Sequence, residues 1–156
     1  MIYLDYSATT PVSYDVLESY IRATRDFSGN PNSLHNLGLK SKALMNSAIK
    51  QISEIFNVLE SEITFTSGAT MSNNLALIGT ALANIKKGNH IIVSRLEHPS
   101  IYKICKYLES IGFEVSVVDN NEEGLIDFED LKRLVRDDTI LVSICAVNSE
   151  TGVRQP

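Results

Sequence analysis

Residues 91–118 read IIVSRLEHPSIYKICKYLESIGFEVSVV, and this stretch decides the fold class of the chain. It begins with the mostly apolar run 91–94 and ends with the valine-rich run 114–118, and both runs are typical of strands. Four apolar residues between the two runs recur at helical spacing: Ile101, Ile104, Leu108 and Ile111. Gly112 follows them as a helix terminator. Two strands joined by a helix of this length predict a right-handed crossover and parallel pairing in one sheet.

The alternation of helix and strand patterns continues on both sides of this stretch. Strands are predicted at residues 62–66 and 139–147, and the second is a nearly continuous apolar run of the kind expected for a central strand buried on both faces. Four further helices are predicted by apolar residues spaced mainly three and four apart: Val16, Leu17, Tyr20 and Ile21; Leu37, Leu44, Ala48, Ile52, Ile55, Phe56 and Leu59; Met71, Leu75, Ile78, Leu82 and Ile85; Leu131 and Leu134. The sequence therefore predicts an α/β fold with a mainly parallel sheet and flanking helices.

Four residues are expected to mark the ends of these helices. Ser13 and Asp127 are N-cap residue types that stand before the first and the last of them. Gly88 follows the helix that starts near Met71 and is expected to terminate it. Pro99 suits the first turn of the helix between the two opening strands.

The composition is that of one soluble globular domain, with 156 residues, 44% of them hydrophobic and 21% charged, and a formal net charge of -5. At this length a compact fold buries roughly 68–70% of the surface of its unfolded chain. The absence of a dense Lys/Arg stripe disfavours nucleic acid as the partner. We expect a cytosolic protein without a membrane span, because no apolar run approaches ~18 residues and the start lacks the pattern of a signal peptide.

Cys105 and Cys145 lie far apart in the sequence, without a CxxC spacing. They predict neither a metal site nor a redox pair. Free cysteine is among the residue types most often buried, so we expect both to be small apolar residues of the core. Neither is expected to be a reactive thiol, because such a thiol needs an electropositive and accessible setting.

Ligands of parallel α/β sheets bind beyond the carboxyl ends of the strands, and three loops there carry polar residues. Residues 67–70 lead into a helix whose free N–H groups would attract an anion such as phosphate, although an ordinary capped turn has the same pattern. His98 could stack on a planar ring or transfer a proton, and is otherwise a capping or surface residue. Asn148 could bind a ligand oxygen, and is otherwise a turn residue.

Five motifs occur in order over nearly the whole chain. They are Tyr3-Leu4-Asp5-Tyr6-Ser7-Ala8-Thr9-Thr10-Pro11, Gly29-Asn30-Pro31-Asn32-Ser33-Leu34-His35, Phe65-Thr66-Ser67-Gly68-Ala69-Thr70, Glu97-His98 and Val147-Asn148-Ser149-Glu150-Thr151-Gly152. Together they resemble the N-terminal part of the cysteine desulfurases of the NifS and IscS type, which are relatives of the class V aminotransferases. The resemblance implies an enzyme that uses pyridoxal 5'-phosphate to remove sulfur from L-cysteine, leaving L-alanine and an enzyme-bound persulfide.

The resemblance also implies a domain assignment and site residues. Residues 1–156 would be a single, incomplete part of the large domain of a fold-type I transferase, with residues 1–12 as an extension that borders the active site. Ala69 and Thr70 match the positions that hold the cofactor phosphate. His98 matches the catalytic histidine that stacks on the pyridine ring and helps proton transfer, and Asn148 matches the asparagine that binds the phenolic oxygen. Ala8, Thr9 and Thr10 match a strand that borders the substrate in the family.

The chain also departs from the pattern of the family. Family members often carry an acidic residue at Met71 and asparagine at Ser149. The family's Schiff-base lysine and sulfur-accepting cysteine would lie beyond residue 156, so we expect the isolated chain to be inactive. The resemblance implies a homo-oligomer that passes sulfur to an acceptor or scaffold protein, for iron–sulfur clusters or thiolation. Two alternatives stay open: a non-catalytic or split module that needs a partner chain, and another class V member such as an aminotransferase or a selenocysteine lyase.

Overall fold

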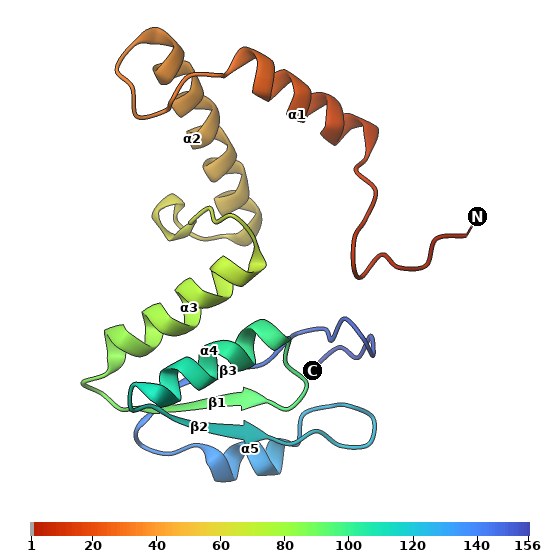
Figure 1. Ribbon diagram of the computed structural model, residues 1–156, viewed down its shortest axis with the longest axis vertical. Helices are drawn as coiled ribbons and strands as arrows, with labels where there is room; N and C mark the ends of the chain where they lie inside the picture. The colour runs from red at the N-terminus through yellow and green to blue at the C-terminus, as the bar shows by residue number, and fades with distance from the viewer. Residues whose placement is uncertain (1) are drawn as a thin grey trace. The chain divides into compact units, whose positions relative to one another are not determined.

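The computed structural model describes residues 2–156, which form two compact units, and the chain passes from the first to the second between Phe65 and Thr66 (Figure 1). The first unit holds α1 (Tyr14–Asp26), α2 (Asn36–Phe56) and the short 3₁₀ helix η1 (Glu60–Glu62). The two helices predicted in this part of the sequence are thus confirmed. Ser13 stands at the N-cap position of α1, as expected, but its side chain makes no cap hydrogen bond.

The loop that joins α1 to α2 lies close against the first turns of α2. Ser41 Oγ donates to the carbonyl oxygen of Phe27 at 2.9 Å. Gly38 has no room for a side chain, because a Cβ there would lie 2.3 Å from the carbonyl oxygen of Ser33. His35 is the N-cap of α2 and accepts from the N–H of Gly38 at 3.3 Å. The motif at residues 29–35 therefore has a structural role at the start of this helix.

The second unit is a parallel sheet with helices on both faces. Its elements are, in order, α3 (Ala69–Asn84), β1 (His90–Ser94), α4 (Pro99–Ser110), β2 (Glu114–Val118), α5 (Phe128–Leu134) and β3 (Thr139–Ser143). The strand order is β2-β1-β3 and both pairs are parallel. The mainly parallel sheet and the flanking helices predicted from the sequence are confirmed. Asp127 caps α5 as expected, since its carboxylate accepts from the N–H groups of Glu129 and Asp130.

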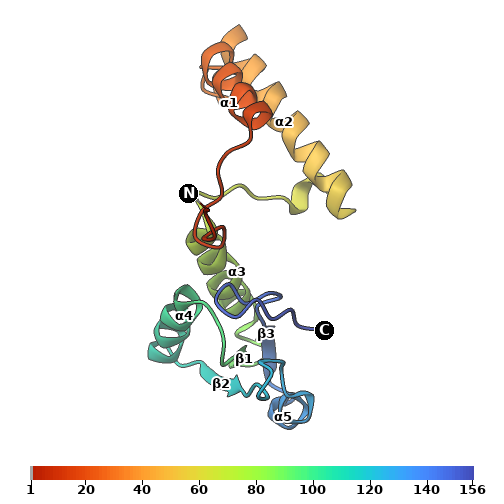
Figure 2. The same cartoon turned by 90° about the vertical axis from the view of Figure 1, so that its right-hand side faces the viewer.

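Two apolar clusters join the helices to the sheet, and Figure 2 shows α4 and α5 on opposite sides of it. The larger cluster packs α3 and α4 against one face: Leu77, Ala81, Ile91, Val93, Ile101, Ile104, Cys105, Leu108 and Phe113. The smaller cluster packs α5 against the other face: Ile92, Val118 and Ile126, with Leu131, Leu134 and Ile144 beside them. Each fully buried Ile or Leu contributes about 1.5–3 kcal/mol, so these two clusters are the main source of stability of the unit.

Two of the predicted strands differ from the structure. Residues 62–66 were expected to pair in a sheet, but η1 covers the first of them and residues 63–66 do not form a strand. Ile63 has an extended backbone, with φ -95° and ψ 124°, so the local preference is kept, but no strand pairs with this segment within residues 2–156. β3 ends at Ser143 rather than at residue 147, and in the described sheet it is an edge strand, while β1 is the central strand.

The buried face of α3 also differs from the prediction. The spacing predicted a face that includes Met71, Leu75 and Leu82, which are between 48% and 53% exposed. The residues of α3 that are buried are Leu77 and Ala81. This helix carries apolar residues on more than one side, and spacing alone does not say which side contacts the sheet.

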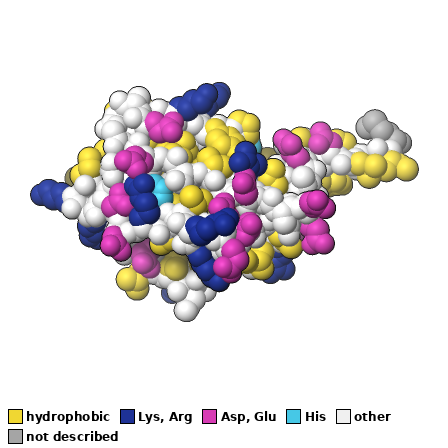
Figure 3. Space-filling model, turned by 90° about the horizontal axis from the view of Figure 1, so that it is seen from below, with side chains coloured by type: hydrophobic (Ala, Val, Ile, Leu, Met, Phe, Trp, Pro, Cys, Tyr) yellow, Lys and Arg dark blue, Asp and Glu magenta, His cyan; other side chains and the backbone are white. Residues whose placement is uncertain are grey.

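Charged side chains of both signs are interspersed on the face seen in Figure 3. On α5, Lys132 pairs with Glu129 at 2.7 Å and Arg133 pairs with Asp130 at 3.1 Å. The side chains of Lys132, Glu129 and Arg133 are exposed, and ion pairs at the surface are worth at most about 1 kcal/mol, so α5 is held mainly by its apolar contacts. None of the helices described between residues 2 and 156 has the length and apolar character that crossing a membrane requires.

His90 is a fully buried histidine at the first position of β1. Its Nδ1 lies 2.8 Å from Thr139 Oγ1 on β3, and its Nε2 lies 2.8 Å from Ser116 Oγ on β2. Burial lowers the pKa of His90 below the ordinary value of 6.5. The folded protein therefore keeps this ring neutral at pH values where an unfolded chain takes up a proton.

The free energy of unfolding of this unit is expected to fall as the pH drops below 6.5, the ordinary histidine pKa, and His90→Gln should reduce the fall. In this range the unfolded chain binds a proton that folded His90 does not, which lowers stability by up to about 1.4 kcal/mol per pH unit. Above this range both states are neutral and the contribution disappears. Urea unfolding of both proteins about one pH unit above and below this value measures the difference. An equal loss in both proteins would contradict the expectation.

Candidate functional site

The N-terminus of α3 presents backbone donors that have no partner. Its N-cap, Gly68, has φ 157° and ψ 175°, a region that essentially only glycine adopts, and no side chain caps the helix. Among residues 2–156 no acceptor meets the N–H groups of Ala69, Thr70 and Met71, nor the hydroxyl of Thr70. These groups and the positive end of the helix dipole suit an anion such as phosphate.

The loop before α3 is shaped by hydroxyl groups. Thr66 Oγ1 lies 2.6 Å from Ser72 Oγ and donates to the carbonyl oxygen of Gly68 at 3.2 Å. Ser67 Oγ donates to the sulfur of Met71 at 3.4 Å. Met71 therefore has a local partner at the position where the resemblance leads one to expect a carboxylate.

His98 begins the helix that follows β1. It is the N-cap of α4, with Pro99 at the first helical position as predicted. Its Nδ1 accepts from the backbone N–H of Ser100 at 3.1 Å and lies 2.8 Å from Ser100 Oγ. His98 thus caps the helix, which was the alternative to a ligand role, and the cap uses only Nδ1. Nε2 has no hydrogen-bond partner in the part of the chain that the structure describes.

Asn148 lies in the loop after β3, and both ends of its amide are held. Its Oδ1 accepts from the N–H of Glu150 at 3.0 Å, and from the N–H and the hydroxyl of Thr151 at 2.8 and 3.1 Å. Its Nδ2 donates to the carbonyl oxygen of Leu96 at 3.0 Å. The amide nitrogen carries two hydrogens, so one remains for a ligand oxygen. The turn role and a ligand role are therefore compatible.

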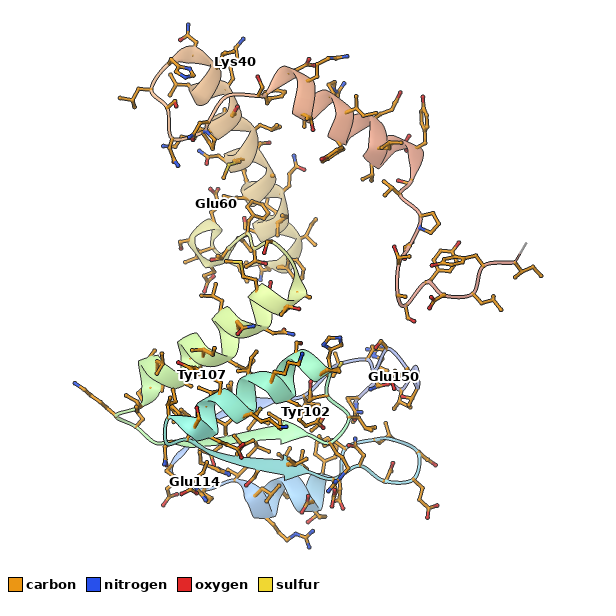
Figure 4. The ribbon with its side chains drawn as sticks, in the orientation of Figure 1. Lys40, Glu60, Tyr102, Tyr107, Glu114 and Glu150 are labelled. Atoms are coloured by element: carbon orange, nitrogen blue, oxygen red, sulfur yellow. The ribbon has the colours of Figure 1, made fainter. Side chains whose placement is uncertain are left out.

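Glu97 connects the loop after β1 to the loop after β3. Its Oε1 accepts from Ser94 Oγ at 3.0 Å and from the N–H of Cys145 at 2.6 Å. The hydroxyl of Tyr102, labelled on α4 in Figure 4, lies within hydrogen-bond distance of the carbonyl oxygens of Ser94 and Arg95. Sequence reasoning missed a structural role for Glu97, for which the only signal was its place directly before His98.

A pocket of about 210 Å³ opens between these two loops. It is lined by Arg95, Leu96, Glu97, His98, Pro99, Cys145, Asn148, Ser149 and Glu150. Glu150 is labelled in the final loop in Figure 4, and Figure 1 shows that α3 and α4 both begin at the end of the unit to which β1 points. The structure thus brings His98 and Asn148 together in one pocket. Ala69 and Thr70 begin α3 at the same end of the unit and are not part of the pocket lining.

The family model described as Aminotransferase class-V matches residues 2–156. The chain belongs to the class-V aminotransferase family. This class-V aminotransferase chain is 44% identical over 156 residues to a protein named cysteine desulfurase IscS 1 from Archaeoglobus fulgidus. That match covers 100% of this chain and 41% of the relative, so the chain spans about two fifths of the length of such relatives.

Two solved structures are similar to this class-V aminotransferase chain. One is titled "NIFS-LIKE PROTEIN", with a TM-score of 0.95 and 40% identity over 99% of this chain and 43% of the other. The second is titled "SspA in complex with cysteine", with a TM-score of 0.91 and 38% identity over 99% of this chain and 44% of the other. These similarities confirm the resemblance to the cysteine desulfurases that the five motifs indicated.

Three predicted residues of this class-V aminotransferase chain, Ala8, Thr9 and Thr10, lie in the first unit. The N–H groups of Ala8 and Thr9 donate to the carbonyl oxygen of Asp5 at 3.2 and 3.3 Å, and Thr10 Oγ1 donates to that of Tyr6 at 3.2 Å. The expected strand is wrong, because Ala8 ends a turn and Thr9 and Thr10 have an irregular backbone. Its place beside the substrate stays a prediction.

The two cysteines of the class-V aminotransferase chain have different surroundings. Cys105 is buried, as expected, and burial raises its pKa to about 11, so its thiol is a poor nucleophile. For Cys145 the prediction is wrong, because this residue follows the end of β3, is half-buried and lines the pocket. Its Sγ donates to the carbonyl oxygen of Val147 at 3.0 Å. Within residues 2–156, no group of three or more His, Cys, Asp and Glu side chains is placed to hold a metal ion.

Proposed function

We propose that this chain supplies the phosphate-binding helix and the ring-binding pocket of a pyridoxal 5'-phosphate-dependent cysteine desulfurase. The observation that carries the proposal is the pocket shared by His98 and Asn148, at the end of the unit where α3 presents unpaired donors. The substrate would be L-cysteine and the products L-alanine and an enzyme-bound persulfide. The names of the relatives and the cysteine complex of one similar structure support this reaction.

The residues of the second unit fit such a cofactor. The free N–H groups at Ala69 and Thr70, with the Thr70 hydroxyl, would hold its phosphate. The second amide hydrogen of Asn148 would donate to its phenolic oxygen, and the His98 ring would lie against its pyridine ring and move a proton through Nε2. When bound, pyridoxal phosphate supplies an electron sink for negative charge that develops on the substrate.

The remaining assignments belong to the same proposal. Residues 1–156 would be part of one large domain, with residues 1–12 as its N-terminal extension and Ala8, Thr9 and Thr10 beside the substrate. The whole enzyme would be a cytosolic homo-oligomer that passes sulfur to an acceptor or scaffold protein for iron–sulfur clusters or thiolation. None of the described residues that line the pocket is a lysine. This chain alone would therefore bind the cofactor reversibly, without a covalent bond, and it would release no sulfide from L-cysteine.

The affinity of the 156-residue chain for pyridoxal phosphate is expected to fall about tenfold in Thr70→Val. The variant removes the hydroxyl that would donate to the phosphate and keeps the shape of the side chain. Thr80→Val, farther along α3, is the matched control and should bind like the wild type. Titration of each protein, followed by the absorbance of the cofactor, measures the affinities. No binding by the wild type would contradict the proposal and favour a non-catalytic module.

A further inference from the structure

His98 is one end of a series of hydrogen bonds that runs from α3 to α4. Nδ2 of Asn73, on α3, lies 2.9 Å from Ser100 Oγ, and Ser100 Oγ lies 2.8 Å from Nδ1 of His98. The backbone N–H of Ser100 also donates to Nδ1, at 3.1 Å. Ser100 is only 8% exposed, so water has little access to these bonds. Asn73 lies one turn after Thr70 on the helix that presents the anion-binding donors.

The backbone N–H of Ser100 sets the direction of the whole series. Because Nδ1 of His98 accepts from this N–H, it carries a lone pair and no proton. A contact of 2.8 Å between that lone pair and Ser100 Oγ is attractive only if the hydroxyl donates to Nδ1. The hydroxyl has one hydrogen, so Asn73 must be the donor to Ser100 Oγ. In the neutral ring the proton is then on Nε2.

We propose that Asn73 and Ser100 are positioning residues that hold His98 in the form with its proton on Nε2. Since Nε2 has no partner within residues 2–156 and His98 lines the pocket, the ring offers a donor to an acceptor group of the ligand. The free amide hydrogen of Asn148 is a second donor in the same pocket. The use of the Nε2 proton in catalysis rests on the proposed function, whereas the series of bonds does not.

Nitrogen-15 NMR of the His98 ring tests this proposal in the 156-residue chain without cofactor, at a pH where the ring is neutral. Nδ1 is expected to have the resonance of an unprotonated, hydrogen-bonded nitrogen, and Nε2 that of a protonated one. Ser100→Ala removes one donor, so the Nδ1 resonance should shift toward that of a nitrogen with fewer hydrogen bonds. Asn73→Asp has nearly the same shape but replaces the donor by a carboxylate. The Ser100 hydroxyl should then turn to the carboxylate, and Nδ1 should shift in the same direction.

Asn74→Asp is the matched control, because it adds the same charge one position along α3. Nδ2 of Asn74 donates to the carbonyl oxygen of Thr70 in its own helix and makes no bond to Ser100, so Nδ1 should not shift. In a double variant, Asn73→Asp should add nothing to Ser100→Ala. A proton on Nδ1 of the wild type, or equal shifts in the two aspartate variants, would overturn the proposal. Failure of pyridoxal phosphate binding would overturn the proposed function and leave these spectra unchanged.

Discussion

Gly88→Ala is expected to lower the free energy of unfolding of the second unit by about 3 kcal/mol. Gly88 joins α3 to β1, and a Cβ there would lie 2.1 Å from the carbonyl oxygen of Asp138. The next nearest atoms, at 2.7 and 2.8 Å, are also backbone atoms of Asp138, so no flexible side chain can move aside. The same carbonyl accepts from the N–H of His90 at 3.2 Å, so any shift that makes room also strains the start of β1.

Gly79→Ala is the control for this substitution. Gly79 is an exposed residue of α3, and a Cβ there would have no heavy atom within 4 Å. Alanine is a better helix former than glycine by about 1 kcal/mol, so this variant should be slightly more stable than the wild type. Urea unfolding followed by circular dichroism compares the three proteins. A Gly88→Ala variant within about 0.5 kcal/mol of the wild type would show that the backbone at Asp138 yields easily.

Gly88 also shows what a local sequence pattern can and cannot predict. The sequence predicts a helix end near this residue, and α3 does end nearby, at Asn84. Glycine was expected here as a helix terminator, but Gly88 does not have the positive φ that such a role favours. Glycine is needed at this position because the backbone passes close to Asp138. Periodicity finds elements because it depends on neighbours in sequence, whereas a contact between segments far apart in the chain leaves no trace in it.

The same distinction explains the errors in the sheet. The bounds of β2 follow from the sequence because a valine-rich run between a glycine and a loop is a local signal. Pairing is not local, so Ile63 is extended without becoming part of a strand, and β3 is an edge strand of the described sheet despite its apolar sequence. The early end of β3, at Ser143, in turn places Cys145 in the pocket lining rather than in the core.

The candidate site could be predicted only in part. His98 and Asn148 follow from the rule that ligands bind beyond the carboxyl ends of parallel strands, and the structure places both in one pocket. Glu97, Ser100 and Asn73 could not be predicted, because their hydrogen bonds join elements whose contact depends on the folded sheet. The residues that hold the site in shape are therefore less visible in the sequence than those that face the pocket.

Glu97→Ala is expected to lower the free energy of unfolding of the second unit by about 3 kcal/mol and to weaken the binding of pyridoxal phosphate. The substitution removes the acceptor for the hydroxyl of Ser94, a residue that is only 3% exposed, and for the N–H of Cys145. A hydrogen bond to a charged group is worth about 1.5–3 kcal/mol, and a buried donor left without a partner adds its own desolvation cost. The loops that carry His98 and Asn148 would then lose one of the bonds between them.

Two further variants separate this structural role from a simple loss of charge. Glu97→Gln keeps an oxygen acceptor for both donors and should retain more than half of the stability that Glu97→Ala loses. Glu150→Ala removes a carboxylate from the same pocket, but the exposed Glu150 side chain makes no hydrogen bond or ion pair within residues 2–156. It should therefore leave the free energy of unfolding unchanged within about 0.5 kcal/mol. If Glu150→Ala weakens cofactor binding in the titration as much as Glu97→Ala does, the lower affinity does not come from the lost connection between the two loops.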